Sequence, residues 1–212
     1  MTYGKDEYQQ LREDISPSEA GRNPHWQISR IDWCDRDGTR VLSEGRAVGA
    51  EPLSQGDGYL LVTDVVLTSP GKALSIRRDA FSGGVQFFVR SGLRLTGPVT
   101  YLRDKSALAI GLTWHQCFWA AAIVPAEAGT FTVLRIEGKS NPDAEWVTRD
   151  NGCFGSSWDL SLAPGQSKSV RVLWVLASGA RDADWCNAIA SHLRGSAGAL
   201  SPELPSNTHK AP

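Results

Sequence analysis

Hydrophobic and polar side chains alternate with a period of two along much of the chain. The clearest run is Ser169–Ala177, in which every second residue is apolar, and Tyr59–Thr68, dense in leucine and valine and bounded by turn residues, predicts a further strand. Successive side chains of a strand point to opposite faces, so this period predicts strands with one buried face. The same pattern and intervening Gly- and Pro-rich turns predict strands at Trp26–Cys34, Arg40–Leu42, Leu74–Arg77, Val85–Val89, Val99–Leu102, Leu108–Leu112, Thr130–Glu137, Glu145–Thr148 and Trp158–Leu162.

The pattern changes within the stretch Leu108–Ile123, which contains two tryptophans, a phenylalanine and a histidine. Its first part alternates, whereas Phe118–Val124 is continuously apolar and is followed by a proline. A continuous run is typical of a strand covered on both faces. Trp114, His115 and Gln116 fall between the two runs, at either a tight turn or a rim, and only at a rim would these side chains meet a ligand.

A helical period appears only near the C-terminus, where Ala180–Leu193 predicts one amphipathic helix. About ten short strands and a late helix indicate an all-β fold, an antiparallel two-sheet β-sandwich with one C-terminal helix. We expect a single domain over residues 25–194. Residues 1–24 are expected to be a flexible tail with room for a short helix between Lys5 and Asp14, and residues 195–212 a disordered tail.

Composition and charge narrow the classes of partner. The chain has 212 residues, is 41% hydrophobic, and carries 22 Lys and Arg against 23 Asp and Glu. It can therefore bury a full core, and its charge balance gives no reason to expect nucleic acid or a membrane surface as a partner. The apolar run is too short to span a bilayer, and no secretory signal is recognised at the polar amino terminus. We therefore expect a cytoplasmic protein with four free thiols; oligomeric state is left open.

Two segments carry a resemblance to a known family. These are Phe-Trp-Ala-Ala-Ala-Ile-Val-Pro at Phe118–Pro125, and Leu-Ala-Pro-Gly-Gln at Leu162–Gln166 before the last strand. Together they resemble the periplasmic domain of the bacterial membrane-protein insertase and, more broadly, the galactose-mutarotase-like β-supersandwich. The resemblance implies a twisted two-sheet sandwich, and its sugar-handling members use a histidine acid with a carboxylate base. Only His115 lies within the predicted sheets, and no carboxylate is matched to the base, although Glu137 and Glu145 are available.

Catalytic and metal-binding alternatives both centre on His115. Paired with Glu137 or Glu145, His115 could serve as a general acid or base; otherwise it is a structural histidine near a strand end. His115 and Cys117 share a face of a strand and, with Cys153, could hold a metal, but a second ligand pair is missing. Cys117 has apolar neighbours that would raise its pKa and leave it inert as a nucleophile. No metal or cofactor is therefore expected.

Tryptophan is the one residue type in surplus, with eight in the chain. Trp119, Trp174 and Trp185 lie in apolar phases and are expected in the core. Trp114 and Trp146 instead adjoin polar or charged residues, a combination suited to stacking on a sugar. The predicted ligand-binding residues are Trp114, His115, Glu145, Trp146 and Arg149, and ordinary packing is the alternative.

Five arginines form a second candidate group. They lie in the middle third of the chain, at Arg77, Arg78, Arg90, Arg94 and Arg103. They could line a sheet face and bind an anionic ligand, or form a solvated face paired with Asp79 and Asp104.

Three hypotheses for function follow. The leading one is a non-catalytic domain that binds a carbohydrate or another protein through an aromatic rim near Trp114, His115 and Trp146. The second is a sugar-modifying enzyme, epimerase- or lyase-like, with His115 in acid–base chemistry. The third is a structural or assembly protein whose exposed strand edges pair with copies of itself.

Overall fold

The described strands assemble into a large antiparallel sheet, a smaller one and a short ribbon. The computed structural model describes residues 9–15, 26–53, 58–78, 85–89, 94–105, 108–110, 113–141, 143–149 and 152–196. Eight strands form the large sheet, in the order β1 (Gln9–Ile15), β2 (Trp26–Cys34), β3 (Arg40–Pro52), β4 (Gly58–Thr68), β15 (Ser167–Ser178), β11 (Gly129–Glu137), β10 (Trp119–Ala126) and β7 (Thr100–Arg103). Neighbouring strands in the described residues pair antiparallel.

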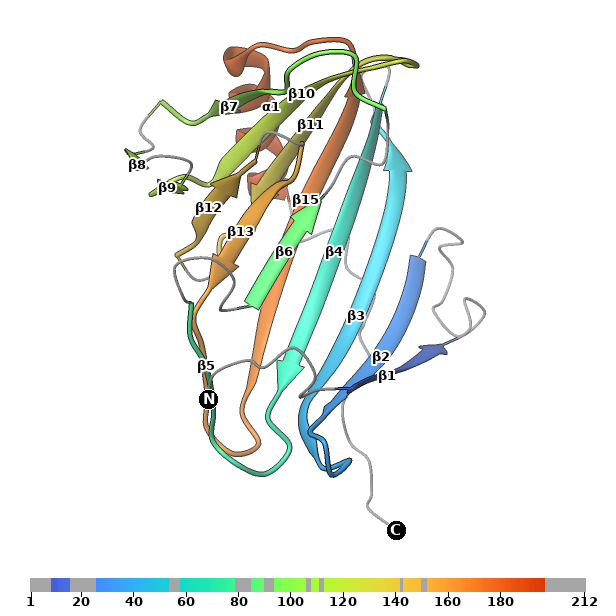
Figure 1. The fold of residues 1–212 in the computed structure, drawn as a ribbon, viewed down its shortest axis with the longest axis vertical. Coiled ribbons are helices and arrows are strands. Elements are labelled where there is room, and N and C mark those ends of the chain that lie inside the picture. Colours follow the sequence, from blue (N-terminus) through green and yellow to red (C-terminus); the bar gives the residue numbers. More distant parts are fainter. Residues whose placement is uncertain are drawn as a thin grey trace.

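A smaller sheet covers part of one face of the large sheet. Its order is β6 (Val85–Val89), β13 (Phe154–Trp158), β12 (Glu145–Thr148), β9 (Thr113–His115) and β8 (Leu108–Ile110), and β14 (Leu160–Leu162) pairs with β5 (Leu74–Ile76) as a ribbon. The small sheet lies in front of the large sheet, with α1 (Ala183–Ser196) behind it (Figure 1). We call these two faces of the large sheet the sandwich face and the helix face. The predicted all-β sandwich with one C-terminal helix is confirmed.

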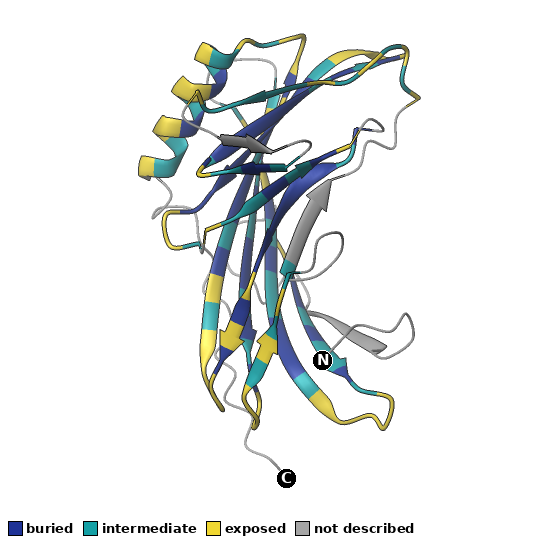
Figure 2. Cartoon of the chain, turned by 60° about the vertical axis from the view of Figure 1, so that its left-hand side comes forward, coloured by how far each residue is buried: buried dark blue, intermediate teal, exposed yellow. Residues whose placement is uncertain are grey.

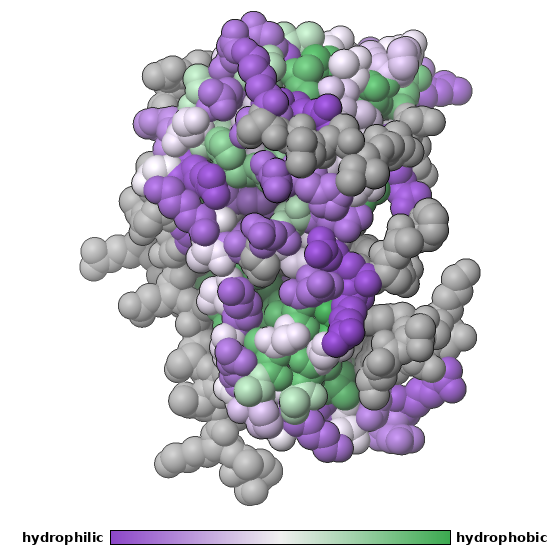
Figure 3. All heavy atoms as spheres, turned by 90° about the vertical axis from the view of Figure 1, so that its left-hand side faces the viewer, coloured by the Kyte–Doolittle hydropathy of each residue, from purple (hydrophilic) through white to green (hydrophobic). Residues whose placement is uncertain are grey.

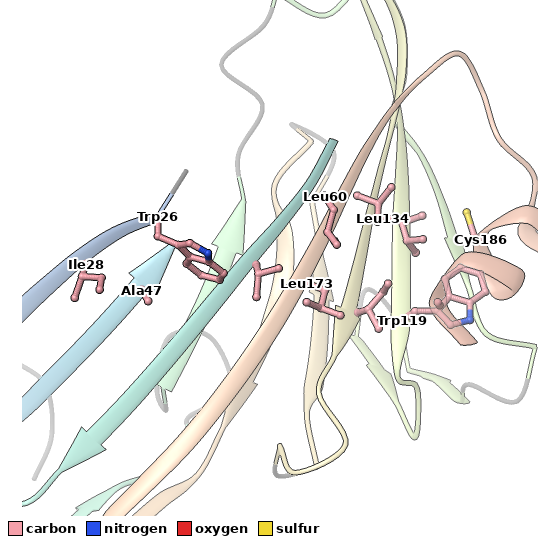
Figure 4. Close-up of a cluster of buried hydrophobic side chains, with 13 residues drawn as sticks. Trp26, Ile28, Ala47, Leu60, Trp119, Leu134, Leu173 and Cys186 are labelled. Carbon is pink, nitrogen blue, oxygen red and sulfur yellow. The ribbon is translucent and has the colours of Figure 1, made fainter. Parts of the chain in front are cut away.

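The helix face holds one continuous core. Trp119 and Leu134 lie beneath α1 close to Cys186, whereas Trp26 and Ile28 lie at the far end of the same cluster (Figure 4). The inner side of α1 is buried and its outer side is exposed (Figure 2). Among the described residues, no helix is both long and apolar enough to cross a membrane.

The sandwich face packs against both smaller units. Beneath the small sheet, Trp114, Trp146 and Phe154 meet alanines of β10, and beneath the ribbon Val65 and Leu67 meet Leu160 and Leu162. Figure 3 shows hydrophobic side chains reaching the surface in the lower half of the molecule, framed by hydrophilic ones. Hydrophobic burial therefore fixes the position of the small sheet and the ribbon over the large sheet.

Several elements differ from the sequence expectations. β3 runs from Arg40 to Pro52, well beyond the expected Arg40–Leu42, and β13 was not expected. Residues Gln9–Ile15 form an edge strand paired with β2, where we expected a flexible tail or a short helix. An isolated helix of about ten residues is marginally stable in water, whereas β1 extends a sheet that is already formed. The rest of 1–24, and residues from 197 onward, lie outside the described residues, so the predicted tails stay predictions there.

A close approach at Gly49 allows the Trp26 ring to lie against β3. A Cβ on Gly49 would lie 2.7 Å from the Trp26 ring, whereas a Cβ on Gly45, on the same strand and face, would meet no atom within 4 Å. Gly49→Ala is expected to lower the free energy of unfolding by about 1–3 kcal/mol, because the buried indole must move. Gly45→Ala is the matched control, expected to change it by less than about 0.5 kcal/mol. Urea unfolding measures both, and equal effects would contradict the close contact.

Candidate functional site

The two tryptophans predicted to form a ligand rim lie in the core. Trp114 is 8% exposed and Trp146 is 1% exposed, and the two residues are directly opposite each other on β9 and β12. The Trp146 indole Nε1 donates a hydrogen bond to the carbonyl oxygen of Cys117, at 2.8 Å. In this conformation neither ring offers a face to a sugar. Gln116 follows β9 with a φ of 57° and begins the bend that links β9 of the small sheet to β10 of the large sheet. A ligand rim at this junction stays a prediction.

The polar residues predicted beside those rings are spread over several environments. His115 is half-buried at the end of β9, Arg149 is exposed, and Glu145 lies 3.4 Å from the guanidinium Nη1 of Arg78. Glu137 is buried on the sandwich face. Within the described part of the chain, no hydrogen bond joins His115 to either glutamate, so their pairing as acid and base stays a prediction.

The thiols have properties of packed side chains. Burial raises the pKa of Cys117 to about 11 and that of Cys186 to about 12. The Cys117 thiol donates to the Trp119 carbonyl oxygen. The described cysteines are free, and no group of three His, Cys, Asp or Glu in the described residues is arranged to hold a metal ion. Thiolate chemistry at neutral pH is therefore disfavoured at Cys117 and Cys186.

The four described arginines of the predicted group do not share one face. Arg78 contacts Glu145 and Asp159, whereas Arg94 is 83% exposed beside Glu127. Arg103 stacks over the Trp114 ring, its guanidinium carbon 5.2 Å from the ring centre. Arg77 is exposed, and Arg90 and Asp79 lie outside the described residues. The described members thus occupy separate sites with their own partners or solvent.

A buried polar cage lies between the two sheets. The Arg135 guanidinium Nη2 donates to Glu137 Oε1 at 2.8 Å and to the Ser156 hydroxyl at 2.6 Å. Ser156 in turn donates to Glu137 Oε1 at 2.7 Å. Rings of Trp174 and Trp146 lie 4.9 and 5.2 Å from the guanidinium carbon. Burial lowers the pKa of Arg135, opposed by the Glu137 carboxylate. Because side chains fill this site, it is a structural element of the sandwich.

On the sandwich face, no described strand covers the part of β2, β3 and β4 that lies beyond β6, the edge strand of the small sheet (Figure 1). Tyr59 is 59% exposed there and Leu176, directly across from it on β15, is 41% exposed. Alternation and register place a row of exposed or half-buried side chains on the same surface. We call this surface the open face; it comprises Gln27, Arg46, Val48, Ala50, Pro52, Tyr59, Leu61, Thr63 and Leu176.

A polar group marks one end of the open face. Arg46 donates from Nε to Glu44 Oε1 at 2.7 Å, and its Nη2 lies 2.5 Å from the same oxygen. Trp33 Nε1 donates to the other carboxylate oxygen of Glu44, at 3.1 Å. The Glu44 side chain is 3% exposed and that of Arg46 is 39% exposed. A buried carboxylate therefore holds an arginine that reaches solvent.

Sequence reasoning did not single out Tyr59, Leu176, Glu44 or Arg46. The first two lie in phase with buried residues of their strands, which made them indistinguishable from core positions. Glu44 and Arg46 are two residues apart and would face the same side of a strand, which was the one sequence signal that could have paired them. Gly45 and Gly49 obscured this signal, because they lower the strand propensity of the segment.

The layers and the open face define an antiparallel β-sandwich with one partly uncovered sheet. The chain belongs to the family described as "Family of unknown function (DUF6807)", whose model matches residues 4–191. Among curated proteins, none matches this sequence. Among solved structures, the chain is similar to a protein from the human microbiome assigned as a kojibiose phosphorylase, with a TM-score of 0.44 and 10% identity. That similarity covers 83% of this chain and 21% of the other, so the chain spans about a fifth of its length. The finer galactose-mutarotase-like assignment stays a prediction.

Proposed function

We propose that this protein is a non-catalytic sandwich domain, of the supersandwich type, that binds carbohydrate on the open face. The observation that carries the proposal is the exposed aromatic ring of Tyr59 near the start of β4, with Leu176 beside it on β15. Large apolar side chains are normally turned inward on a sheet with a buried face. An aromatic side chain left outside on a structured strand is thus a candidate contact for a ligand.

The chemistry of the open face suits a saccharide. Sugar rings present C–H groups on a face and hydroxyls around the edge, so their sites combine an apolar platform with a few fixed polar groups. Tyr59 and Leu176 supply such a platform. Gln27 and Thr63 supply donors and acceptors at half-buried or exposed positions along the neighbouring strands, and Arg46 supplies further donors.

The proposal excludes catalysis because the carboxylate of this region is already engaged. Glu44 accepts from both Trp33 and Arg46 and is almost fully buried. A general acid or base must exchange protons with the substrate, which requires access to it. Glu44 instead acts as a support for its neighbours on the sheet.

The proposal is tested by titrating the protein with a panel of neutral and acidic oligosaccharides in a calorimeter. Tyr59→Ala is expected to weaken the best ligand by about tenfold or more, because the stacking surface is lost. Tyr59→Phe keeps the ring and is expected to retain most of the affinity. Tyr101→Phe is the control for a substitution away from the open face. It removes a hydroxyl that donates to the Arg149 carbonyl oxygen. Failure of every saccharide to bind, or unchanged affinity in Tyr59→Ala, would overturn the proposal.

A further inference from the structure

The guanidinium of Arg46 is fixed before any ligand arrives. Both of its hydrogen bonds go to one oxygen of Glu44, and Trp33 holds the other oxygen. A buried carboxylate held at both oxygens cannot swing away without breaking these bonds. Little rotamer entropy then remains for Arg46 to lose on binding, which favours tight recognition.

Among the described residues, one edge of this guanidinium has no partner. Arginine has a side edge formed by Nε and Nη2 and an end edge formed by Nη1 and Nη2. Glu44 occupies the side edge. Within the described residues Arg46 has no further polar partner, and 39% of its side chain is exposed. Two parallel N–H groups at the end edge match the two oxygens of a carboxylate, the bidentate geometry in which arginine binds most strongly.

Building on the function proposed above, we propose that the ligand of the open face is an acidic oligosaccharide containing uronic acid residues. One carboxylate of the sugar chain binds the end edge of Arg46, while another sugar ring of the same chain stacks on Tyr59. The two anchors are well separated. Arg46 lies opposite Val65 and Pro52 lies opposite Tyr59, six residues further along β3. At about 3.3 Å per residue this is about 20 Å, longer than one sugar ring.

Geometry rather than net charge accounts for the preference. Glu44 neutralises the charge of Arg46. The open face therefore binds an anion only when the oxygens of that anion accept hydrogen bonds from both N–H groups of the Arg46 end edge. Neutral sugars offer hydroxyls that can accept single hydrogen bonds from the same group, but a carboxylate receives two charge-assisted bonds. We therefore expect a weak dependence on ionic strength together with a strong dependence on the carboxyl group.

The test compares each acidic oligosaccharide with its carboxyl-reduced counterpart of the same length and linkage. The panel consists of oligogalacturonate, oligoguluronate, oligomannuronate and oligoglucuronate. The unaltered protein is expected to bind at least one acidic member about tenfold or more tightly than its reduced form. Arg46→Lys keeps the charge but has no paired edge, and is expected to lose most of this preference. Arg40→Lys, at the start of the same strand and away from the open face, is the matched control.

A second variant provides an independent test in case Arg46→Lys fails to fold. In the double variant Glu44→Gln/Arg46→Met, no buried charge is left without its partner, and the Gln side chain can still accept from Trp33. This variant is expected to bind the reduced oligosaccharide as the unaltered protein does, without preferring the acidic form.

The outcomes separate the two proposals. Equal affinity for acidic and reduced oligosaccharides, with loss in Tyr59→Ala, overturns the uronate inference and leaves carbohydrate binding in place. A preference that survives in both Arg46 variants also overturns the inference. Absence of binding by every oligosaccharide overturns both.

Discussion

Replacing Arg135 by methionine is expected to lower the free energy of unfolding by about 3–5 kcal/mol, because it leaves the Glu137 carboxylate buried without its cationic partner. Methionine has a similar length, so the change removes the charge more than the volume. Arg135 is 0% exposed, and its Nη2 contacts both Glu137 and Ser156. Urea unfolding followed by tryptophan fluorescence measures the effect.

Two further variants serve as controls for Arg135→Met. Arg94→Met removes an exposed arginine 3.4 Å from Glu127 and is expected to cost less than about 1 kcal/mol. The double variant Arg135→Met/Glu137→Leu replaces the buried pair by apolar side chains and is expected to recover part of the lost stability, because the Ser156 hydroxyl and the Asn141 amide then lose their acceptor on Glu137. A loss in Arg135→Met no larger than that in Arg94→Met would show that the cage contributes little.

Replacing Trp146 by alanine is expected to lower the free energy of unfolding by about 3–5 kcal/mol, because it opens a large cavity under the small sheet. The ring is 1% exposed, packs beside Arg135, and donates to the Cys117 carbonyl oxygen. Trp146→Phe fills part of the space but leaves that oxygen without its donor. We therefore expect an intermediate loss of about 1–3 kcal/mol.

This second prediction also separates packing from ligand binding at Trp146. If the ring served a ligand, Trp146→Phe would weaken saccharide binding at unchanged stability. If it serves the core, stability falls while affinity for the open face, measured at low temperature on folded protein, stays the same. Calorimetric titration of the folded variant and its urea unfolding curve together distinguish the two.

Much of the fold could be predicted from the sequence because its strands bury one face. Tyr59–Thr68 is dense in leucine and valine and Ser169–Ala177 has an apolar residue at every second position, and both are long strands at the centre of the large sheet. β13, with the sequence Phe-Gly-Ser-Ser-Trp, was missed since its small polar residues carry no apolar alternation. Ser156 is nevertheless fully buried, because Arg135 and Glu137 across the sandwich satisfy its hydroxyl. Tertiary contacts, rather than the local sequence pattern, thus account for the formation and burial of β13.

The candidate site was harder to predict for a geometric reason. Trp114 and Trp146 have polar neighbours in the sequence, but adjacent residues of a strand face opposite ways. A polar neighbour therefore says little about the surroundings of the ring itself. Tyr59 is the opposite case. It lies on the same face of β4 as buried Val65, but the small sheet ends at β6 and leaves Tyr59 exposed. Where one sheet stops covering another depends on the packing of the whole molecule.

The pairing of β4 with β15 has a consequence for how the chain acquires its structure during synthesis. Asp64 and Arg171, which bond across these strands, are 107 positions apart. The hairpins of β2, β3 and β4 can form as soon as they leave the ribosome, but the free edge of β4 must then wait for nearly the whole remaining chain. Loop closure over such a distance slows folding, and an unpaired edge invites association with other chains. We therefore expect the segment β2–β4 to expose an unpaired strand edge until β15 has been made.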